Sequence, residues 1–178
     1  MHRLFVALRP PRPVRAALLN LMGGVENARW QDDAQLHLTL RYIGEVPPTL
    51  ADDVAEELER VAMQPFPLTL QGVAHFERKG MPHSLWAGVA PSEPLKVLQG
   101  RAERACRRAG CAAEGRKFTP HVTLARLNRS AGSIGGWLRA HGAFTSERWL
   151  ADHMILYESH LTPHGSDYQP VVRYPLRG

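Results

Sequence analysis

Apolar and polar residues alternate along two short segments of the chain. From Leu36 to Ile43 the sequence reads L-H-L-T-L-R-Y-I, and from Phe118 to Leu127 it reads F-T-P-H-V-T-L-A-R-L. A period of two is typical of a β-strand that buries one face and leaves the other open. We therefore expect a strand in each segment, with leucine and valine toward the core.

The remaining pattern predicts further strands, three long helices and several turns. Helices are expected over residues 14–22, from the pair Pro47-Pro48 onward, and over 91–110. The second of these buries Leu50, Val54, Leu58 and Val61 along one stripe. Residues 77–83 (E-R-K-G-M-P-H) predict a turn or loop, and 130–142, with four glycines, a weak helix or mobile loop. Further strands are expected over 3–8, 66–76, 84–90, 144–149, 154–158 and 168–174.

The order of these elements repeats along the chain. Each half carries a strand, a long helix and a hairpin-like pair of strands, and each carries one of the alternating segments. A length of 178 residues suits one large domain or two small intertwined lobes, and no linker divides it. We expect an α+β fold in which helices pack outside two antiparallel sheets, related by a rough internal two-fold.

The two alternating segments share the pattern His-x-Thr-Leu, at His37–Leu40 and at His121–Leu124. Residues two apart on a strand face the same way, so each histidine shares a face with the following threonine, Thr39 or Thr123. A two-fold would bring both polar faces to one cleft. An imidazole can give or take a proton near neutral pH, and a hydroxyl can bind a phosphate oxygen. One acid and one base on opposite sides of a phosphorus suit hydrolysis of a phosphodiester.

Two other interpretations of the motifs stay open at this point. A single His-x-Thr in a strand is usually only a half-exposed strand, although two copies in corresponding positions are less expected by chance. His37 and His121 could also chelate a metal, but no Asp, Glu or Cys lies within two residues of either histidine.

The segments L-F-V-A-L, H-L-T-L-R-Y-I-G-E-V and F-T-P-H-V-T-L-A-R-L, in that order, resemble the 2H phosphoesterases, and within them the RNA 2′,3′-cyclic phosphodiesterases, also called 2′-5′ RNA ligases. The end of the chain, from Leu156 to Leu176, resembles the same family. The resemblance implies one bilobal domain over residues 1–178, with one motif in each lobe and both in a central cleft.

The resemblance also implies roles for individual residues. His37 would be the proton donor to the leaving ribose oxygen and His121 the proton acceptor that activates water. Thr39 and Thr123 would hold the phosphate. Hydrolysis would need no cofactor and no metal and would leave a 2′-phosphate, and the reverse reaction would join RNA ends through a 2′-5′ bond. The implied partners are RNA with 2′,3′-cyclic-phosphate or 2′-phosphate ends and nucleotides.

Other cationic and aromatic residues are secondary candidates. Strict alternation gives Arg41 the same face as His37, where it could bind phosphate or only line the rim. Arg126 matches the family motif as a phosphate ligand, but alternation gives it, like Tyr42, the core face, where Tyr42 would serve packing. The segment 75–86 carries Arg78, Lys79 and His83, which could follow an RNA backbone or simply be solvated.

Composition and charge bear on the chemical class of the partners and on the cellular compartment. The formal net charge of +5 and a pI near 9.7 favour anionic partners such as phosphates or nucleic acid. Cys106 and Cys111 predict reduced thiols, and the apolar run near the N-terminus is too short for a signal peptide or a membrane span. We expect a cytoplasmic monomer without membrane contact. Two alternatives remain: an enzyme on a cyclic mononucleotide or ADP-ribose cyclic phosphate, and a non-catalytic RNA-binding module.

Overall fold

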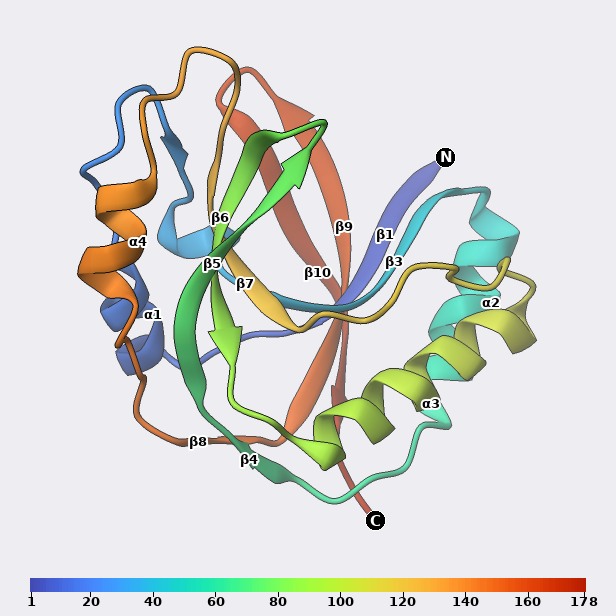
Figure 1. Ribbon diagram of the computed structural model, residues 1–178. Helices are drawn as coiled ribbons and strands as arrows, with labels where there is room; N and C mark the ends of the chain where they lie inside the picture. The colour runs from blue at the N-terminus through green and yellow to red at the C-terminus, as the bar shows by residue number, and fades with distance from the viewer.

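Antiparallel strands occupy the middle of the molecule and helices cover its flanks, in a computed structural model that describes residues 1–178 (Figure 1). The helices are α1 (Arg12–Leu19), α2 (Pro48–Glu59), α3 (Glu93–Ala109) and α4 (Gly135–His141), with one 3-10 turn, η1 (Asp33–Gln35). The strands are β1 (His2–Leu8), β2 (Arg29–Trp30), β3 (Leu38–Val46), β4 (Phe66–Leu68), β5 (Leu70–Arg78), β6 (Met81–Val89), β7 (His121–Arg126), β8 (Trp149–Ala151), β9 (His153–Thr162) and β10 (Gly165–Pro175).

The main sheet consists of two groups of strands that meet at one point. Its order is β10-β9-β1-β3-β7-β6-β5, and β2 pairs with β7 beside this path. Strands β3 and β7, which carry the two motifs, share only the register pair Leu38–Val122. The strands β4 and β8 form a separate two-stranded sheet. The expected α+β class, with antiparallel sheets and outer helices, is confirmed.

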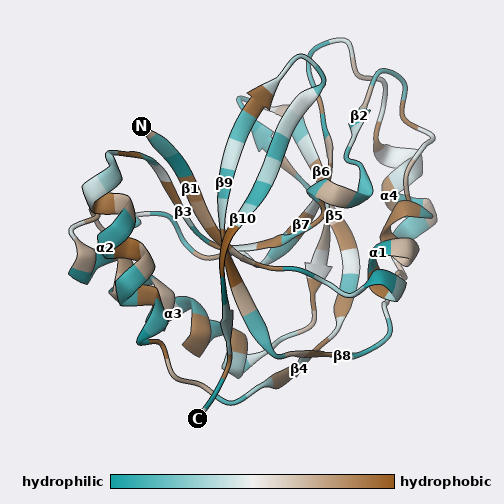
Figure 2. Ribbon diagram, turned by 180° about the vertical axis from the view of Figure 1, so that it is seen from behind, coloured by the Kyte–Doolittle hydropathy of each residue, from teal (hydrophilic) through white to brown (hydrophobic).

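The two groups of strands, with their helices, form two lobes. The first lobe contains β10, β9, β1 and β3, and α2 and α3 pack on each other, α3 against β3 and α2 against β1 and β10. The second lobe contains β7, β6, β5 and β2, with α1 and α4 side by side at its edge (Figures 1 and 2). The hairpin β5–β6 comes from the first half of the sequence yet lies beside the second motif. The lobes are therefore interleaved and do not correspond to the two halves of the chain.

Leucine and valine from the periodic segments build the core. Val54 and Leu58 of α2 are fully buried, and the other two members of the expected stripe, Leu50 and Val61, pack half-buried against the same core. Hydrophobic segments gather where β1 and β9 cross the middle of the molecule, whereas α2 and α3 alternate hydrophobic and hydrophilic turns (Figure 2). This pattern is that of amphipathic helices covering a sheet.

Three element boundaries differ from the sequence pattern. The strand expected over 66–76 divides at Thr69, because β4 pairs with β8 while β5 pairs with β6. Residues 77–83, expected as a loop, continue both strands of the hairpin, and only Lys79 and Gly80 form the turn. Both have positive φ, 53° and 77°, as a two-residue hairpin turn of the primed type requires. The strand expected over 144–149 is β8, which begins only at Trp149.

Segment 130–142, expected as a weak helix or a mobile loop, forms a short helix, α4, in its second half. The long helix expected over 91–110 is confirmed as α3. Its first turn is capped by the Ser92 hydroxyl, which accepts from the Leu95 amide at 3.2 Å, and Gly110 ends it with φ of 118°. None of the helices combines the length and apolar character needed to cross a bilayer.

Candidate active site

Each motif strand contains an extra residue directly after its threonine that reverses its alternation, and β3 contains a second one at Ile43. Along β3, Thr39 pairs with Ala7 of β1 and Arg41 pairs with Val6, so Leu40 has no partner of its own. Along β7, Thr123 pairs with Trp86 and Ala125 with Leu85, so Leu124 is skipped in the same way. Such β-bulges turn the residues beyond them onto the opposite face.

The bulge in β3 makes the alternation argument for Arg41 and Tyr42 wrong. Arg41 shares the face of its partner Val6, toward the helices, and is only 6% exposed. Its guanidinium donates to a Glu103 carboxylate oxygen and to the Tyr42 and Ala112 carbonyl oxygens. Tyr42 pairs with Phe5, whose ring packs on His37, and is 45% exposed on the cleft side. Arg41 therefore ties β3 to α3, and its polar atoms are engaged within the protein.

The bulge in β7 has the opposite consequence for Arg126. Its register partner is Ser84 of β6, and Thr123 two pairs away is opposite Trp86, whose ring packs on His121. Arg126 therefore faces the cleft, although strict alternation gave it the core face. Its guanidinium makes no hydrogen bond within the chain and is exposed.

The four motif residues with His or Thr side chains form one polar group on the sheet. Continuing the antiparallel register from Leu38–Val122 places His37 opposite Thr123 and Thr39 opposite His121. Side chains opposite each other on adjacent strands lie close enough to act on one small group. The structure thus joins the two motif strands at Leu38–Val122, with one histidine and one threonine directly on either side of that pair in each strand.

Both imidazole rings are anchored at the same nitrogen. The Nδ1 atom of His37 lies 2.7 Å from the Gln35 carbonyl oxygen, and that of His121 lies 2.7 Å from the Thr119 carbonyl oxygen. A carbonyl oxygen can only accept, so each Nδ1 carries a hydrogen. The Nε2 atom of each ring is therefore the one that titrates.

Aromatic rings surround both histidines. The ring of Phe5 lies 4.8 Å from His37 and that of Tyr168 lies 5.1 Å away in an edge-on arrangement. Around His121, Phe76 lies 5.0 Å away, also edge-on, and Trp86 lies 5.4 Å away. These rings fix the imidazoles and exclude water from one side of each.

Burial among these rings lowers the pKa of both histidines. Burial, together with the charges of His121, Arg126 and Arg9, lowers the pKa of His37 to about 4, against the opposing effect of the Gln35 hydrogen bond. The pKa of His121 is lowered by burial and by Arg126. Both imidazoles are therefore neutral in the ligand-free protein at neutral pH. An anionic group between them would raise both pKa values, because it stabilises the imidazolium form.

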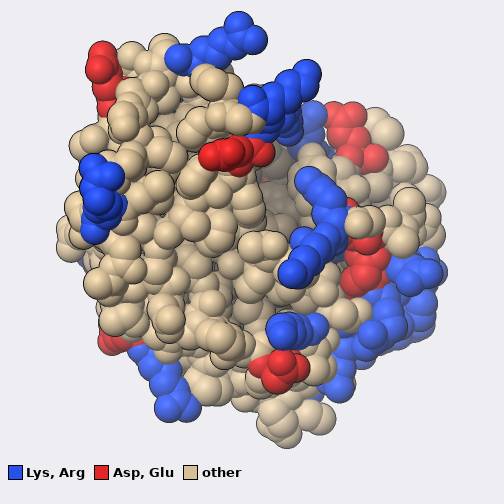
Figure 3. All heavy atoms as spheres, in the orientation of Figure 1, with Lys and Arg blue, Asp and Glu red and all other residues tan.

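A cleft of about 580 Å³ opens beside the motifs. Thr39, His121 and Arg126 border it, together with Tyr42, whereas His37 and Thr123 are not among the residues that border it. On this face of the molecule a hollow is visible with Lys and Arg side chains along two of its sides (Figure 3). The cleft is larger than the space that one phosphate group occupies, so it can hold further parts of a substrate.

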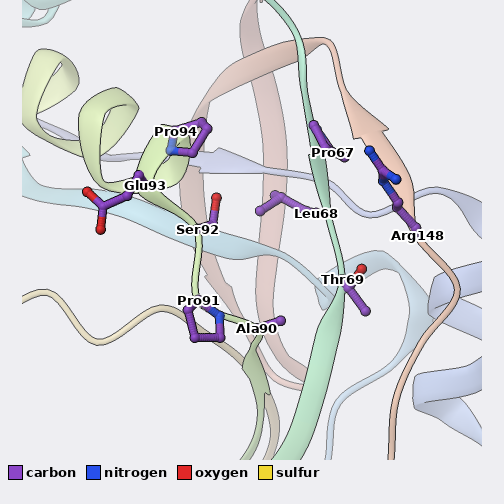
Figure 4. Close-up of a pocket in the computed structure, with 9 residues that line it drawn as sticks. All are labelled: Pro67, Leu68, Thr69, Ala90, Pro91, Ser92, Glu93, Pro94 and Arg148. Carbon is purple, nitrogen blue, oxygen red and sulfur yellow. The ribbon is translucent and has the colours of Figure 1, made fainter.

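A second hollow, of about 270 Å³, lies at the N-terminal end of α3 and is separate from the motifs (Figure 4). It is bordered by Pro67, Leu68, Thr69, Ala90, Pro91, Ser92, Glu93, Pro94 and Arg148. It contains neither histidine nor a second titratable pair that could exchange protons. The chemistry therefore belongs to the cleft beside β3 and β7.

Two donors beside the second motif were not singled out from the sequence. The Ser84 hydroxyl and the Trp86 indole nitrogen are buried and have no hydrogen-bond partner in the chain. Both lie on the cleft face of β6, in register with Arg126 and Thr123. No three His, Cys, Asp or Glu side chains gather at one point, so a metal held by His37 and His121 would have no third ligand from these residue types.

Comparison with known proteins places this site in a family. Residues 10–162 match the family model described as the 2'-5' RNA ligase superfamily. A protein of Thermus thermophilus, named RNA 2',3'-cyclic phosphodiesterase, is 34% identical over 190 residues, which cover 99% of this chain and 91% of the relative. A protein of Escherichia coli with the same name is 28% identical over 183 residues, covering 98% and 97%.

Solved structures agree over the whole chain. A crystal structure of a phosphoesterase superposes with a TM-score of 0.84 at 26% identity, covering 99% of both chains. The crystal structure of E. coli LigT complexed with 3'-AMP superposes with a TM-score of 0.80 at 25% identity, covering 98% of both. The resemblance inferred from the two motifs is confirmed, and the chain belongs to the 2'-5' RNA ligase superfamily.

Proposed function

We propose that this protein is an RNA 2′,3′-cyclic phosphodiesterase, which opens a terminal cyclic phosphate to a 2′-phosphomonoester. The observation that carries the proposal is the matched pair of imidazoles, each held at Nδ1 by a backbone carbonyl and each directly next to the Leu38–Val122 pair that joins the two motif strands. The name shared by the relatives supports the same activity.

The proposed reaction is an in-line displacement at phosphorus. His121 Nε2 accepts a proton from water as the water oxygen bonds to phosphorus. The bond from phosphorus to the ribose 3′-oxygen breaks, and His37 donates a proton to that oxygen. The products are a 3′-hydroxyl and a 2′-phosphate. With a ribose 5′-hydroxyl in place of water, the same displacement would form a 2′-5′ bond. The assignment of His37 as acid and His121 as base is carried over from the family resemblance.

The remaining cleft residues would hold the phosphate. The hydroxyls of Thr39 and Thr123 would donate to the non-bridging oxygens, on which negative charge increases in the transition state. Arg126 would add a cation with its donors free. The anionic phosphate would also raise the pKa of His37, so that substrate binding would load the acid with its proton.

Three substrates distinguish this proposal from its alternatives. They are an oligonucleotide ending in a 2′,3′-cyclic phosphate, the matching cyclic mononucleotide, and ADP-ribose cyclic phosphate. We expect the oligonucleotide to be hydrolysed with the highest kcat/KM and ³¹P NMR to show only the 2′-phosphate. Preference for either small substrate would favour the small-nucleotide enzyme. Binding of the oligonucleotide without turnover would favour the RNA-binding module, and a 3′-phosphate product would contradict the proposed roles of the histidines.

We further propose that the protein acts as a monomer in the cytoplasm. Both motifs lie in one chain, so the site needs no second copy to be complete. Cys106 and Cys111 are free thiols, as is usual in a reducing compartment. Gel filtration with light scattering would test the monomer, and fractionation of cells the compartment.

A further inference from the structure

The cleft beside the motifs carries more positive charge than one phosphate group requires. Five cationic residues border it, and two of them have carboxylate partners: Arg41 pairs with Glu103, and Arg116 pairs with Glu114 at 3.3 Å. The remaining three, Arg78, Lys117 and Arg126, form no ion pair in the chain. Arg126 belongs to the motif, so Arg78 and Lys117 are left without an assigned role.

These two residues reach the cleft from different lobes. Arg78 is the last residue of β5 in the second lobe and pairs with Met81 across the Lys79–Gly80 turn. The short hairpin turn holds its backbone in one conformation. Arg78 borders the cleft together with His83, whose pKa is lowered by burial and further by the charges of Arg78 and Arg126.

Lys117 belongs to the segment between α3 and β7, which is fixed to the first lobe. The buried Arg41 guanidinium donates to the Ala112 carbonyl oxygen and to Glu103, and the other Glu103 oxygen accepts from the Glu114 amide at 3.0 Å. Arg41, whose polar atoms are engaged within the protein, thus positions the segment that carries Lys117. Both unpaired cations border the same cleft, where five cationic residues outnumber the two carboxylates Glu77 and Glu114, and such an excess of positive charge concentrates the field on an anionic substrate.

From this arrangement we propose that Arg78 and Lys117 bind the phosphodiester that precedes the terminal nucleoside of the RNA, so that the enzyme prefers an oligonucleotide end to a mononucleotide. This inference rests on the proposed function. In an RNA strand the negative charge next to a terminal cyclic phosphate is the 5′-phosphate of the same nucleoside. A nucleoside 2′,3′-cyclic phosphate with a free 5′-hydroxyl lacks that charge.

The test compares three substrates that differ only in the upstream group. They are a nucleoside 2′,3′-cyclic phosphate, the dinucleotide that ends in the same cyclic phosphate, and that dinucleotide with an uncharged methylphosphonate linkage. They are assayed with the parent protein, with the double variant Arg78→Gln/Lys117→Gln, and with Lys96→Gln. Lys96 is exposed on α3, pairs only with Glu93 and does not border the cleft, so its variant controls for the loss of a positive charge outside the cleft.

For the parent we expect a kcat/KM about tenfold higher with the phosphodiester dinucleotide than with the nucleoside cyclic phosphate or the methylphosphonate dinucleotide. One charge-assisted contact to the upstream phosphate would give a difference of this size. The double variant should lose that advantage and keep the mononucleotide rate within about twofold. Lys96→Gln should behave as the parent. Equal rates for the two dinucleotides in the parent, or equal loss on all substrates in the double variant, would overturn the inference while leaving the proposed function intact. A parent that opens no cyclic phosphate at all would reject both.

Discussion

His37 and His121 are held in the same way, each with Nδ1 at 2.7 Å from the carbonyl oxygen of the residue two positions earlier. The two-residue offset is common to both motifs, although the 3-10 turn η1 (Asp33–Gln35) precedes β3 and no regular element directly precedes β7. Either imidazole can therefore present Nε2 to a reacting group. What differs between the two is their surroundings, with Phe5 and Tyr168 on one and Phe76 and Trp86 on the other.

Replacing either catalytic candidate should reduce turnover without unfolding the protein. We expect His37→Ala and His121→Ala each to lower kcat by at least about 10²-fold, the usual contribution of one acid or base. His164→Ala, at the exposed tip of the β9–β10 hairpin, is the matched control and should keep full activity. Steady-state kinetics and thermal unfolding on the same samples check both statements. Near-full activity in either motif variant would reject the acid–base pair.

The lowered pKa of His37 predicts a loss of stability in mild acid. Its pKa is about 4 in the folded protein and about 6.5 in an unfolded chain, so between these values the unfolded state binds more protons. The free energy of unfolding should therefore fall as the pH falls from 6.5 toward 4, by on the order of 2 kcal/mol from this residue. His121 acts in the same direction.

Urea unfolding at pH 7.5, 5.5 and 4.5 measures this effect. The comparison is with His37→Gln, which retains much of the side-chain volume but cannot titrate. The variant should lose less stability than the parent between pH 6.5 and 4. If the two proteins show parallel curves over this range, burial of His37 has no net effect on its protonation.

Replacing Arg41 should mainly lower the stability of the protein, whereas replacing Arg126 should mainly lower its activity. Arg41→Ala leaves the largely buried Glu103 carboxylate without its cation, which should cost about 3 kcal/mol in the free energy of unfolding. Arg126→Ala removes an exposed side chain, so stability should change by less than about 0.5 kcal/mol. The second variant should instead lower kcat/KM by on the order of 10²-fold. The reverse outcome, with Arg126 needed for folding and Arg41 only for turnover, would contradict the bulge assignments.

Activity should survive a chelator. The proposed proton transfers use Nε2 of two imidazoles, and two hydroxyls with Arg126 hold the phosphate. Assays of the parent in excess EDTA, after dialysis against it, should give unchanged kcat. Loss of activity that returns on adding a divalent cation would instead give His37 and His121 the role of metal ligands.

Removing the hydroxyl should change the free energy of unfolding differently at two buried serines. The Ser146 hydroxyl accepts from the Leu70 amide at 2.9 Å and donates to the Glu147 carbonyl oxygen at 2.8 Å, so Ser146→Ala should cost about 1–3 kcal/mol. The Ser84 hydroxyl has no partner, so Ser84→Ala should be neutral or slightly stabilising. Chemical denaturation of both variants checks the pair. A large destabilisation by Ser84→Ala would reveal a hydrogen bond to that hydroxyl.

The sequence was sufficient to predict the elements that carry the chemistry. The period of two around His37 and His121, and the repeat of His-x-Thr-Leu, predicted both motif strands and the face that each histidine occupies. Pro94 near its start and Gly110 at its end predicted α3 within two residues. These are local signals, and local propensity and tertiary packing agree at these positions.

What failed were positions where the fold depends on distant partners. The bulges at Leu40 and Leu124 arise in the pairing with β1 and β6, and nothing in the alternation of β3 or β7 marks them. As a result the faces of Arg41, Tyr42 and Arg126 were all inverted. The interleaving of the lobes was equally hidden, because hydrophobic periodicity says which face is buried but not against which neighbour.

Because the lobes are interleaved, the contacts of the sheet form in a fixed order as the chain is synthesised. Of the strands of this sheet β1 is synthesised first, and one of its two neighbours, β9, begins only at His153. Until β9 and β10 have been made, Phe5 and Ala7 lack Tyr157 and Ile155, and the His37 ring lacks Tyr168. A nascent chain stalled after β7 would already contain both histidines, yet His37 would lack part of its aromatic surroundings. We therefore expect the surroundings of His37 to be completed after those of His121, whose partners Phe76 and Trp86 precede it in the chain.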